Sequence, residues 1–338
     1  VKNLVEKLIV LFNYDVSNAW YPVLQKAIEV GSTFEGWSPH EEDITYHLLV
    51  CLKPPDGHIF QLEPGPEWPM RNFHIHLEFM CTCERERLTG ETRCFLHDPK
   101  EDQSRKECPN ILQDLCTDSY LDVQKIAEWF QKTVKRFWKD LPESATHRLM
   151  VLPSKRSCKF QVTQGCKKSL LIELLFGVQE GDSDIFVSSQ NTEAAYTPST
   201  MWLESYAVAE MKFFSYIALQ AQPDSCHLRC LQLCVRSLLG RDFSTYTLKT
   251  VVMHLLTTLP LSDWHKDSFM QRLQDITQYL QSCLKQKCLY HFFIGNANLP
   301  EEIILPQELR MAGPLNIFQH LEHDLDAHEE ARLDFLML

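Results

Sequence analysis

The stretch LLIELLF, residues 170–176, is an apolar, strand-like run that a single carboxylate, Glu173, interrupts. An ionised acid in an apolar environment costs several kcal/mol unless a partner compensates its charge. We therefore expect a metal ion or a cationic side chain beside Glu173. Two plainer arrangements remain open: Glu173 faces water at a sheet edge, or it forms a structural ion pair with an arginine.

A Gly-Ser pair and two further acids lie upstream of this strand. Glu41 and Asp43 are two positions apart at the start of an apolar run, so an extended chain points them to the same side. Three converging carboxylates behind a turn at Gly31 and Ser32 are typical of magnesium-dependent nucleotidyl transfer. The alternative is a solvated charge run that enters a strand.

The order of apolar patterns predicts two lobes in a chain of 338 residues. Strand-like runs fill the first half, at 44–51, 74–83, 147–152, 158–163, 169–177 and 185–189. Among them, apolar residues at helical spacing predict one long helix over 121–141. From Pro198 onward the pattern is helical, so we expect an α+β lobe over 1–193 and an all-helical lobe over 194–338.

Charge and hydropathy restrict the partners. The net charge is -12 and the sequence pI is about 5.6, which opposes binding to the phosphates of nucleic acids, so no nucleic-acid partner is expected. No run approaches the roughly 20 apolar residues that span a bilayer. The chain starts at Val1 without a signal peptide, so we expect a soluble domain trimmed from a longer protein.

Four soft ligands predict a second chemical site. Cys81 and Cys83 face the same way on an extended strand, and Cys94 and His97 follow across an expected hairpin. Together they can form a tetrahedral zinc site, although the spacing is not that of a standard finger. A disulfide or free thiols are the alternatives, and the total of thirteen cysteines leaves at least one unpaired.

Two segments near the C-terminus carry a family resemblance. The sequences STYTLKT at 244–250 and CLYHFFIGNANL at 288–299 resemble the C-terminal signatures of the Mab-21-like family, which includes cyclic GMP-AMP synthase. The resemblance spans nearly the whole chain. Within the family, FEGW at 34–37, CFLH at 94–97 and HFFIGN at 291–296 resemble the inositol-trisphosphate receptor-interacting protein group, especially its "like" members. The resemblance implies a nucleotidyltransferase lobe followed by a helical lobe of the HhH/H2TH type.

The resemblance also implies roles for residues of this chain. Gly31 and Ser32 would grip a triphosphate, Tyr246 would stack on the base, and Thr245 and Lys249 would lie beside it. The magnesium ligands would be Glu41, Asp43 and Glu173.

Several departures from the active enzymes weaken that carry-over. Glutamate stands at 173 in place of an aspartate, Gln232 replaces a phosphate-contacting lysine, and the DNA-binding thumb is absent. The loop between Gly31 and Glu41 is also shorter. These departures indicate a degraded or repurposed pocket.

Two functional hypotheses follow. The first is a catalytically silent binding module that modulates an inositol-trisphosphate receptor, or an immune receptor, by protein contact. Members of the resembled group carry an N-terminal membrane segment and a coiled coil ahead of this domain, so the full protein would be membrane-associated. The second is an active magnesium-dependent enzyme that makes a linear or cyclic nucleotide product.

Overall fold

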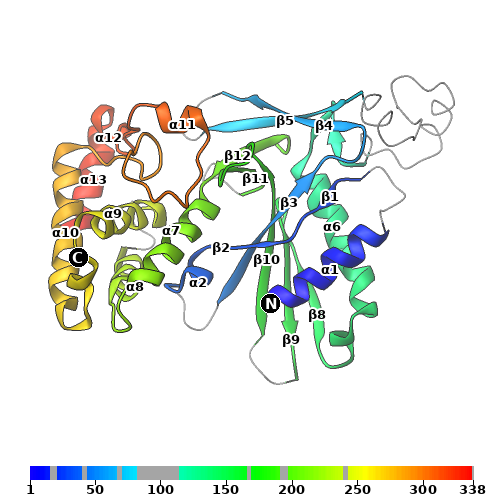
Figure 1. The fold of residues 1–338 in the computed structure, drawn as a ribbon, viewed down its shortest axis with the longest axis horizontal. Coiled ribbons are helices and arrows are strands. Elements are labelled where there is room, and N and C mark those ends of the chain that lie inside the picture. The colour runs from blue at the N-terminus through cyan, green and yellow to red at the C-terminus, as the bar shows by residue number, and fades with distance from the viewer. Residues whose placement is uncertain are drawn as a thin grey trace. The chain divides into compact units, whose positions relative to one another are not determined.

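The computed structural model describes residues 1–15, 21–39, 44–66, 71–81, 114–165, 169–190, 197–238 and 243–336. They belong to two compact units. The first unit comprises Val1–Gly31, Asp43–Gly181 and Ile185–Val208, and the second comprises Ser32–Glu42, Asp182–Asp184 and Ala209–Leu338. The predicted α+β class, a mixed sheet with flanking helices followed by a helical region, is confirmed (Figure 1).

A mixed sheet organises the first unit. Twelve strands of the described residues take part: β1 (Val23–Leu24), β2 (Ile28–Val30), β3 (Thr45–Lys53), β4 (His58–Pro64), β5 (Asn72–Phe79), β6 (Cys116–Thr117), β7 (Tyr120–Leu121), β8 (Arg148–Leu152), β9 (Cys158–Thr163), β10 (Leu170–Gln179), β11 (Phe186–Ser188) and β12 (Met201–Ser205). The main path runs β1-β3-β10-β11-β12-β5-β7-β6, with β2 on β3, β4 on β5, and β8-β9 on β10. The pair β3 and β10 is parallel.

The run that contains Glu173 is the central strand β10, with β3 on one side and β9 on the other. Alternation along the strand divides its side chains between two faces. Ile172, Leu174 and Phe176 are fully buried on one face. Glu173 and Leu175 therefore lie on the opposite face, where Leu175 packs against a small core around Leu49.

Two helices cover the first of these faces. Helix α6 (Val123–Phe137) begins at Asp122, whose carboxylate accepts hydrogen bonds from two backbone amides of the first turn, as at a stable N-cap. Its Phe130 ring lies 5.0 Å from Phe176 and 4.1 Å from Phe12 of helix α1 (Lys2–Asp15). Aromatic contacts thus join both helices to the sheet. Figure 1 shows α1 and α6 beside it.

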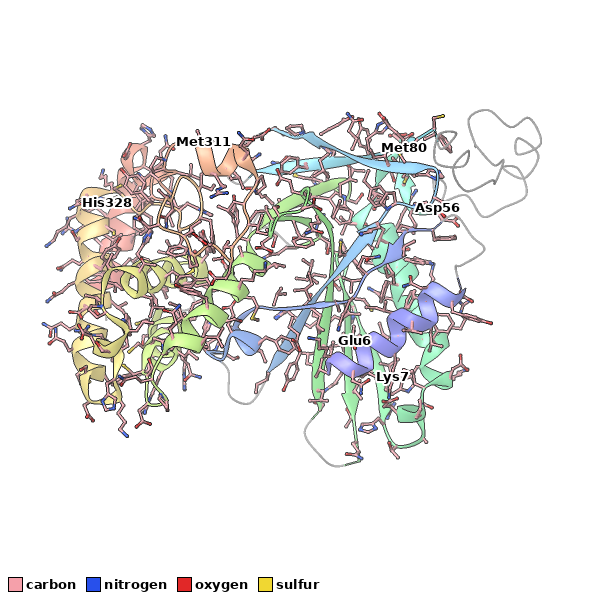
Figure 2. The ribbon with its side chains drawn as sticks, viewed as in Figure 1. Glu6, Lys7, Asp56, Met80, Met311 and His328 are labelled. Atoms are coloured by element: carbon pink, nitrogen blue, oxygen red, sulfur yellow. The ribbon has the colours of Figure 1, made fainter. Side chains whose placement is uncertain are left out.

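Ion pairs fasten the polar side of α1. Lys7 pairs with Glu143, in the 3-10 turn Pro142–Ala145 that follows the turn Trp138–Asp140. Glu6 pairs with Lys26, and both Glu6 and Lys7 are labelled in Figure 2. These exposed pairs contribute little stability individually, about 0–1 kcal/mol each.

A buried arginine secures the connection between β11 and β12. The Arg156 guanidinium donates to the carbonyls of Ser189, Pro198 and Met201, at 3.2, 3.1 and 2.6 Å. Arg156 is 7% exposed, so these carbonyls replace the water that its charge would otherwise need. One side chain therefore holds together the end of β11 and the residues that lead into β12.

The second unit is helical. Its elements are α2 (Ser32–Glu35), α7 (Ala207–Gln220, whose first two residues belong to the first unit), α8 (His227–Leu238), α9 (Thr245–Thr258), α10 (Phe269–Gln286), α11 (Gln307–Met311), α12 (His320–His323), α13 (Leu325–Leu336), and the 3-10 turns Leu261–Trp264 and Lys266–Ser268. Phe213 and Phe292 pack edge to face at 4.8 Å in its core. Among the described residues, no helix is long and apolar enough to cross a membrane.

The strands that the sequence predicted are present, and some were missed. β12 lies beyond residue 192, after which the sequence showed only helical patterns, and it pairs with β5 and β11. Strand β4 was also missed; only His58 of its seven residues is buried, so burial imposes little apolar pattern on its sequence. The division into 1–193 and 194–338 stays a prediction; the compact units of the structure are interleaved along the chain.

Candidate functional site

Glu173 lies between a lysine and a histidine on neighbouring strands. The register places His47 of β3 and Lys159 of β9 directly opposite it. Lys159 Nζ and His47 Nε2 each lie 3.5 Å from Glu173 Oε2. Ser157 Oγ donates to the other carboxylate oxygen at 2.6 Å. Of the two expected neighbours, a metal ion or a cationic side chain, the structure shows the cation: Lys159, which cross-strand pairing brings beside Glu173.

These contacts keep Glu173 ionised. The side chain is only 19% exposed, and burial alone would raise the pKa of its carboxyl. Hydrogen bonding by His47 and Ser157, with the charge of Lys159, outweighs burial and lowers the pKa to about 2. Glu173 therefore carries a full negative charge at neutral pH.

Gly31 approaches the same cluster through His47. Gly31 follows β2, whose Val30 pairs with His47. Its φ of +83° is a conformation that glycine adopts readily, and a β carbon there would lie 3.5 Å from His47 Nδ1. Gly31, His47 and Glu173 thus form one continuous group in the first unit.

The described residues of this group do not fit magnesium. Mg²⁺ requires several oxygen ligands, yet the Glu173 carboxylate is occupied by a hydroxyl donor and by Lys159. Among residues of the described ranges, no group of three or more His, Cys, Asp or Glu side chains can hold a metal ion. The other predicted magnesium ligands, Glu41 and Asp43, lie outside the described residues.

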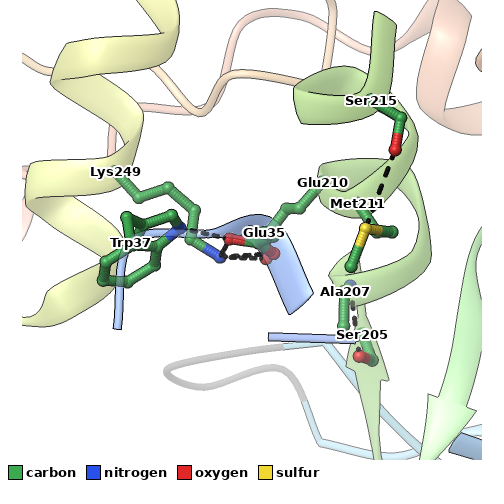
Figure 3. Close-up of polar contacts among 8 residues, drawn as sticks. All are labelled: Glu35, Trp37, Ser205, Ala207, Glu210, Met211, Ser215 and Lys249. Carbon is green, nitrogen blue, oxygen red and sulfur yellow. Dashed lines mark hydrogen bonds and ion pairs between the residues drawn. The ribbon is translucent and has the colours of Figure 1, made fainter. Parts of the chain in front are cut away.

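Ser32 opens a short segment of the second unit that ends in a buried ion cluster. Its carbonyl accepts a hydrogen bond from the backbone amide of Trp37 at 3.0 Å. Glu35, at the end of α2, and Glu210 of α7 both contact Lys249 of α9 (Figure 3). The Lys249 ammonium lies 3.1 Å from Glu35 Oε2 and 2.7 Å from Glu210 Oε2.

Lys249 is buried with its carboxylate partners. The side chains of Lys249, Glu35 and Glu210 are 7%, 0% and 10% exposed. Burial alone would lower the pKa of Lys249, but the charges of Glu210 and Glu35 outweigh it and raise that pKa. Trp37 donates its indole N–H to Glu35 at 2.6 Å, and its ring lies 5.3 Å from the ammonium.

The pKa of Glu35 moves in the opposite direction from that of Glu173. Burial of Glu35 raises its pKa, and the nearby charge of Glu210 adds to the rise. Lys249 and Trp37 oppose this rise without cancelling it. Two carboxylates share one ammonium, so the cluster retains excess negative charge when all three groups are ionised.

The other residues with predicted nucleotide roles lie on α9 and α8. Thr245 begins α9 behind the Ser244 cap. The Tyr246 ring lies 5.3 Å from the ring of His291, and burial together with Glu210 raises the pKa of the tyrosine. Gln232 donates its amide to the carbonyl of Ser38 at 2.7 Å.

The predicted zinc ligands lie mostly outside the described residues. Cys81 is exposed just after β5. Cys83, Cys94 and His97 fall between residues 82 and 113, which the structure does not describe. The zinc site stays a prediction.

The partners of Glu173 and Lys249 were missed by sequence reasoning. Only the register of the strands identifies Lys159 and His47 as partners of Glu173. His47 lies 126 positions from Glu173 along the chain. Glu35 and Trp37 belong to the FEGW segment that carried the group resemblance. The FEGW segment could have indicated this cluster, because it places an acid, Glu35, two positions before Trp37.

Comparison with known proteins places this geometry in a family. Residues 227–312 match the Mab-21 protein HhH/H2TH-like domain. The chain belongs to the Mab-21-like family, as its C-terminal signatures predicted. Its nucleotidyltransferase-like sheet lobe and helical lobe follow that family's architecture.

Within the family, the similar proteins are those of the inositol-trisphosphate receptor-interacting group. "Inositol 1,4,5-trisphosphate receptor-interacting protein-like 1" of Rattus norvegicus is 33% identical over 347 residues, covering 99% of this chain and 62% of the relative. "Inositol 1,4,5-trisphosphate receptor-interacting protein" of Homo sapiens is 31% identical, covering 94% of this chain and 62% of the relative. The chain thus spans about three fifths of these relatives, 62% of each. The predicted group is confirmed.

Proposed function

We propose that this chain is a catalytically silent nucleotidyltransferase-fold module that regulates a receptor or channel by direct protein contact. The names of its relatives support a protein partner, because they describe proteins that interact with the inositol 1,4,5-trisphosphate receptor. In the full protein, a preceding membrane segment would hold the module near such a receptor. The observation that carries the silent pocket is the internal neutralisation of Glu173 and Lys249.

Glu173 supports the proposal through its partners. A catalytic carboxylate must offer its oxygens to a divalent cation. Here Lys159 and Ser157 contact those oxygens, and a second positive charge beside Lys159 would be repelled. Binding magnesium would first require these contacts to break.

Lys249 supports the proposal in the same way, with a positive charge in place of the negative charge of Glu173. A lysine that recognises a nucleotide must direct its ammonium to the ligand. Lys249 directs its ammonium to Glu35 and Glu210, and its side chain is 7% exposed. Rotating it toward a ligand would leave two buried carboxylates without their counter-ion, which is strongly unfavourable.

One observation favours an active magnesium-dependent nucleotidyltransferase as the second candidate. Gly31, the residue expected to shape the phosphate turn, lies against His47, which contacts an ionised Glu173. If Glu41 and Asp43 approach the same face, a nucleotide with its own magnesium ions could compete with Lys159. The two candidates therefore predict different responses to nucleotide.

Isothermal titration of Mg-ATP and Mg-GTP into the chain distinguishes the two candidates, with product analysis on the same samples. Glu173→Gln removes the charge at the expected metal site, and Glu128→Gln on the exposed side of α6 is the matched control. We expect no linked nucleotide product from any sample. Saturable binding with a product, lost in Glu173→Gln and kept in Glu128→Gln, would establish the enzyme.

Receptor binding is tested separately. The purified chain is immobilised, and detergent-solubilised inositol 1,4,5-trisphosphate receptor is passed over it by biolayer interferometry. We expect saturable binding that is unchanged by Glu173→Gln. A wild-type chain that gives no signal with this receptor or with its isolated cytosolic domains would contradict the proposed partner class.

A further inference from the structure

Strand β8 (Arg148–Leu152) has a neighbour on one side only. All five of its residues pair in register with β9, from Arg148↔Thr163 to Leu152↔Lys159. In the part of the sheet that the structure describes, no strand pairs with its other edge. Because successive backbone groups of a strand alternate in direction, part of the β8 backbone points outward from the sheet.

This edge is held rigidly. Gln131 of α6 donates to the carbonyls of Ser154 and Ser157 in the turn that joins β8 to β9, at 2.9 and 3.0 Å. The hydroxyls of those two serines lie 2.6 Å apart. Arg156, between them, donates to three carbonyls of the sheet lobe. A preformed edge costs a binding partner little ordering entropy.

The two faces of β8 differ. Leu149 and Val151 pair with Val162 and Phe160, two residues that are buried in the core that α6 covers. Met150 points to the other face and is 49% exposed. The edge therefore combines open backbone groups with a flexible apolar side chain, as at surfaces that accept varied partners.

Positive charge borders both ends of this edge. Arg148 begins the strand, and Lys155 lies in the turn after it, both exposed. Lys135 lies one helical turn after Gln131, whose side chain contacts that turn, and so shares the same face of α6. Among the described residues, these three cations have no carboxylate oxygen within 4.0 Å.

Other cations of the first unit do have carboxylate partners. Nearby cations such as Lys7, Arg136 and Lys159 are each paired with an acid. The chain as a whole carries a net charge of -12, so acids are in excess. Lys135, Arg148 and Lys155 differ from these three paired cations, and their charge is available to the acidic groups of a partner.

We propose that the outer edge of β8 binds an extended, acidic segment of the protein partner by strand addition. Main-chain hydrogen bonds to β8 would supply affinity, while Lys135, Arg148 and Lys155 would select acidic side chains. Five residues of strand match a segment about 17 Å long. The same cations repel a second copy of β8, so the edge does not pair with itself. This inference rests on the proposed function for the existence of a protein partner.

The strand-addition mode has a direct readout in hydrogen exchange. The chain is measured alone and with the inositol 1,4,5-trisphosphate receptor, at a concentration that saturates the interferometry signal. We expect outward amides within 148–152 to exchange about tenfold more slowly in the complex. Saturated binding without added protection in this segment would overturn the inference while leaving the proposed function intact.

Charge reversal tests the cationic border. Lys135→Glu/Lys155→Glu is compared with Lys53→Glu/Lys285→Glu, which makes the same charge change at exposed positions elsewhere. We expect about tenfold weaker receptor binding for the first pair and less than twofold change for the second. Circular dichroism and thermal unfolding confirm that all variants fold. Equal effects of the two pairs would overturn the role of this edge.

Two further experiments test whether the acidic ligand of the β8 edge is a receptor segment or a membrane surface. Peptides that tile the receptor are tested against the chain, with each binding peptide repeated after its Asp and Glu residues become Asn and Gln. We expect binding peptides to be acidic and to lose affinity on neutralisation. Vesicles of phosphatidylserine and phosphatidylcholine are the second arm. Retention on vesicles that the double reversal abolishes, with receptor binding unaffected, would overturn the inference in favour of a membrane surface.

Discussion

The Glu173 cluster of the first unit and the Lys249 cluster of the second each compensate a buried charge, but with different ratios of carboxylate to ammonium. Glu173 is one carboxylate between Lys159 and His47, and its side chain is 19% exposed. Lys249 is one ammonium between Glu35 and Glu210, and its side chain is 7% exposed. In both clusters, the polar group expected to contact a ligand is compensated by the chain itself.

The contrast shows what determines the pKa of a buried glutamate. Both Glu173 and Glu35 are desolvated, which raises a carboxyl pKa. For Glu173, hydrogen bonds and an unshared lysine outweigh desolvation, and the pKa falls to about 2. For Glu35, the lysine is shared with Glu210, and the pKa rises. Burial, which is deeper at Glu35, and the second carboxylate beside Lys249 together give the opposite direction.

The largest effect is expected from removing the shared cation. Lys249→Met leaves two buried carboxylates without a counter-ion and should lower the free energy of unfolding by about 3–5 kcal/mol. Urea unfolding followed by circular dichroism measures the loss. The control is Lys249→Met/Glu35→Gln/Glu210→Gln, which removes all three charges and should recover most of it. A loss below about 1 kcal/mol in the single variant would contradict a charged, fully buried cluster.

A smaller effect is expected at Glu173. Glu173→Gln keeps the size of the side chain, and Lys159 can turn to water because its side chain is 32% exposed. The free energy of unfolding should fall by about 1 kcal/mol. Glu78→Gln, on an exposed part of β5, is the matched control and should change it by less than about 0.5 kcal/mol. Equal losses at Glu173 and Lys249 would remove the distinction between the clusters.

Acid should destabilise the two units in different pH ranges. In the second unit, burial lowers the pKa of His227 from 6.5 to about 4. Unfolding lets this imidazole gain a proton, so stability is lost as pH falls from about 6.5 to about 4. Glu173 behaves as a depressed carboxyl, and its contribution is lost only between about 4.5 and 2.

The free energy of unfolding measured from pH 7.5 to pH 3 tests this order. His227→Gln keeps a polar side chain but cannot titrate, so its stability should change less than that of the wild type between pH 6.5 and pH 4. His147→Gln is a control, because His147 sits in an exposed turn before β8. An unchanged pH profile in His227→Gln would assign the acid sensitivity to other groups.

The smallest expected difference between the two clusters is the effect of salt on their coupling energies. A double-mutant cycle of Lys159→Met and Glu173→Gln measures the coupling between those side chains. Raising ionic strength to about 1 M shortens the screening length to roughly 3 Å, so this partly exposed coupling should weaken by a few tenths of a kcal/mol. The corresponding Lys249 and Glu210 cycle should change less, because those side chains are only 7% and 10% exposed.

Local patterns predicted much of the sheet. The runs at 158–163 and 169–177 correspond to β9 and β10, and the helical aromatics at 121–141 correspond to α6 and the 3-10 turn after it. These elements were recognisable because burial on one or both faces imposes a period on the sequence. β12 was not, since five residues after a proline give too little pattern, and its identity depends on pairing with distant β5.

The candidate sites, too, could be predicted only where the local sequence determines them. The anomaly at Glu173 was sufficient to predict a compensating cation, because desolvation of a carboxylate follows from its apolar neighbours alone. The identity of that cation required the register of three strands. Lys249 was expected beside a nucleotide. Nothing in the sequence of its helix indicates that its partners are Glu210 and Glu35, which lies 214 positions away.

The parallel pair β3 and β10 has a consequence for how the protein is made. The two strands pair from Leu171↔Thr45 onward, so β10 leaves the ribosome roughly 125 residues after β3. At about 5–20 residues per second, the nascent chain carries β3 for roughly 6–25 s before its partner exists. β1 and β2 can pair with β3 early, but they do not replace β10. The apolar β3 strand thus stays without its parallel partner for that time during translation, and slower synthesis lengthens the wait.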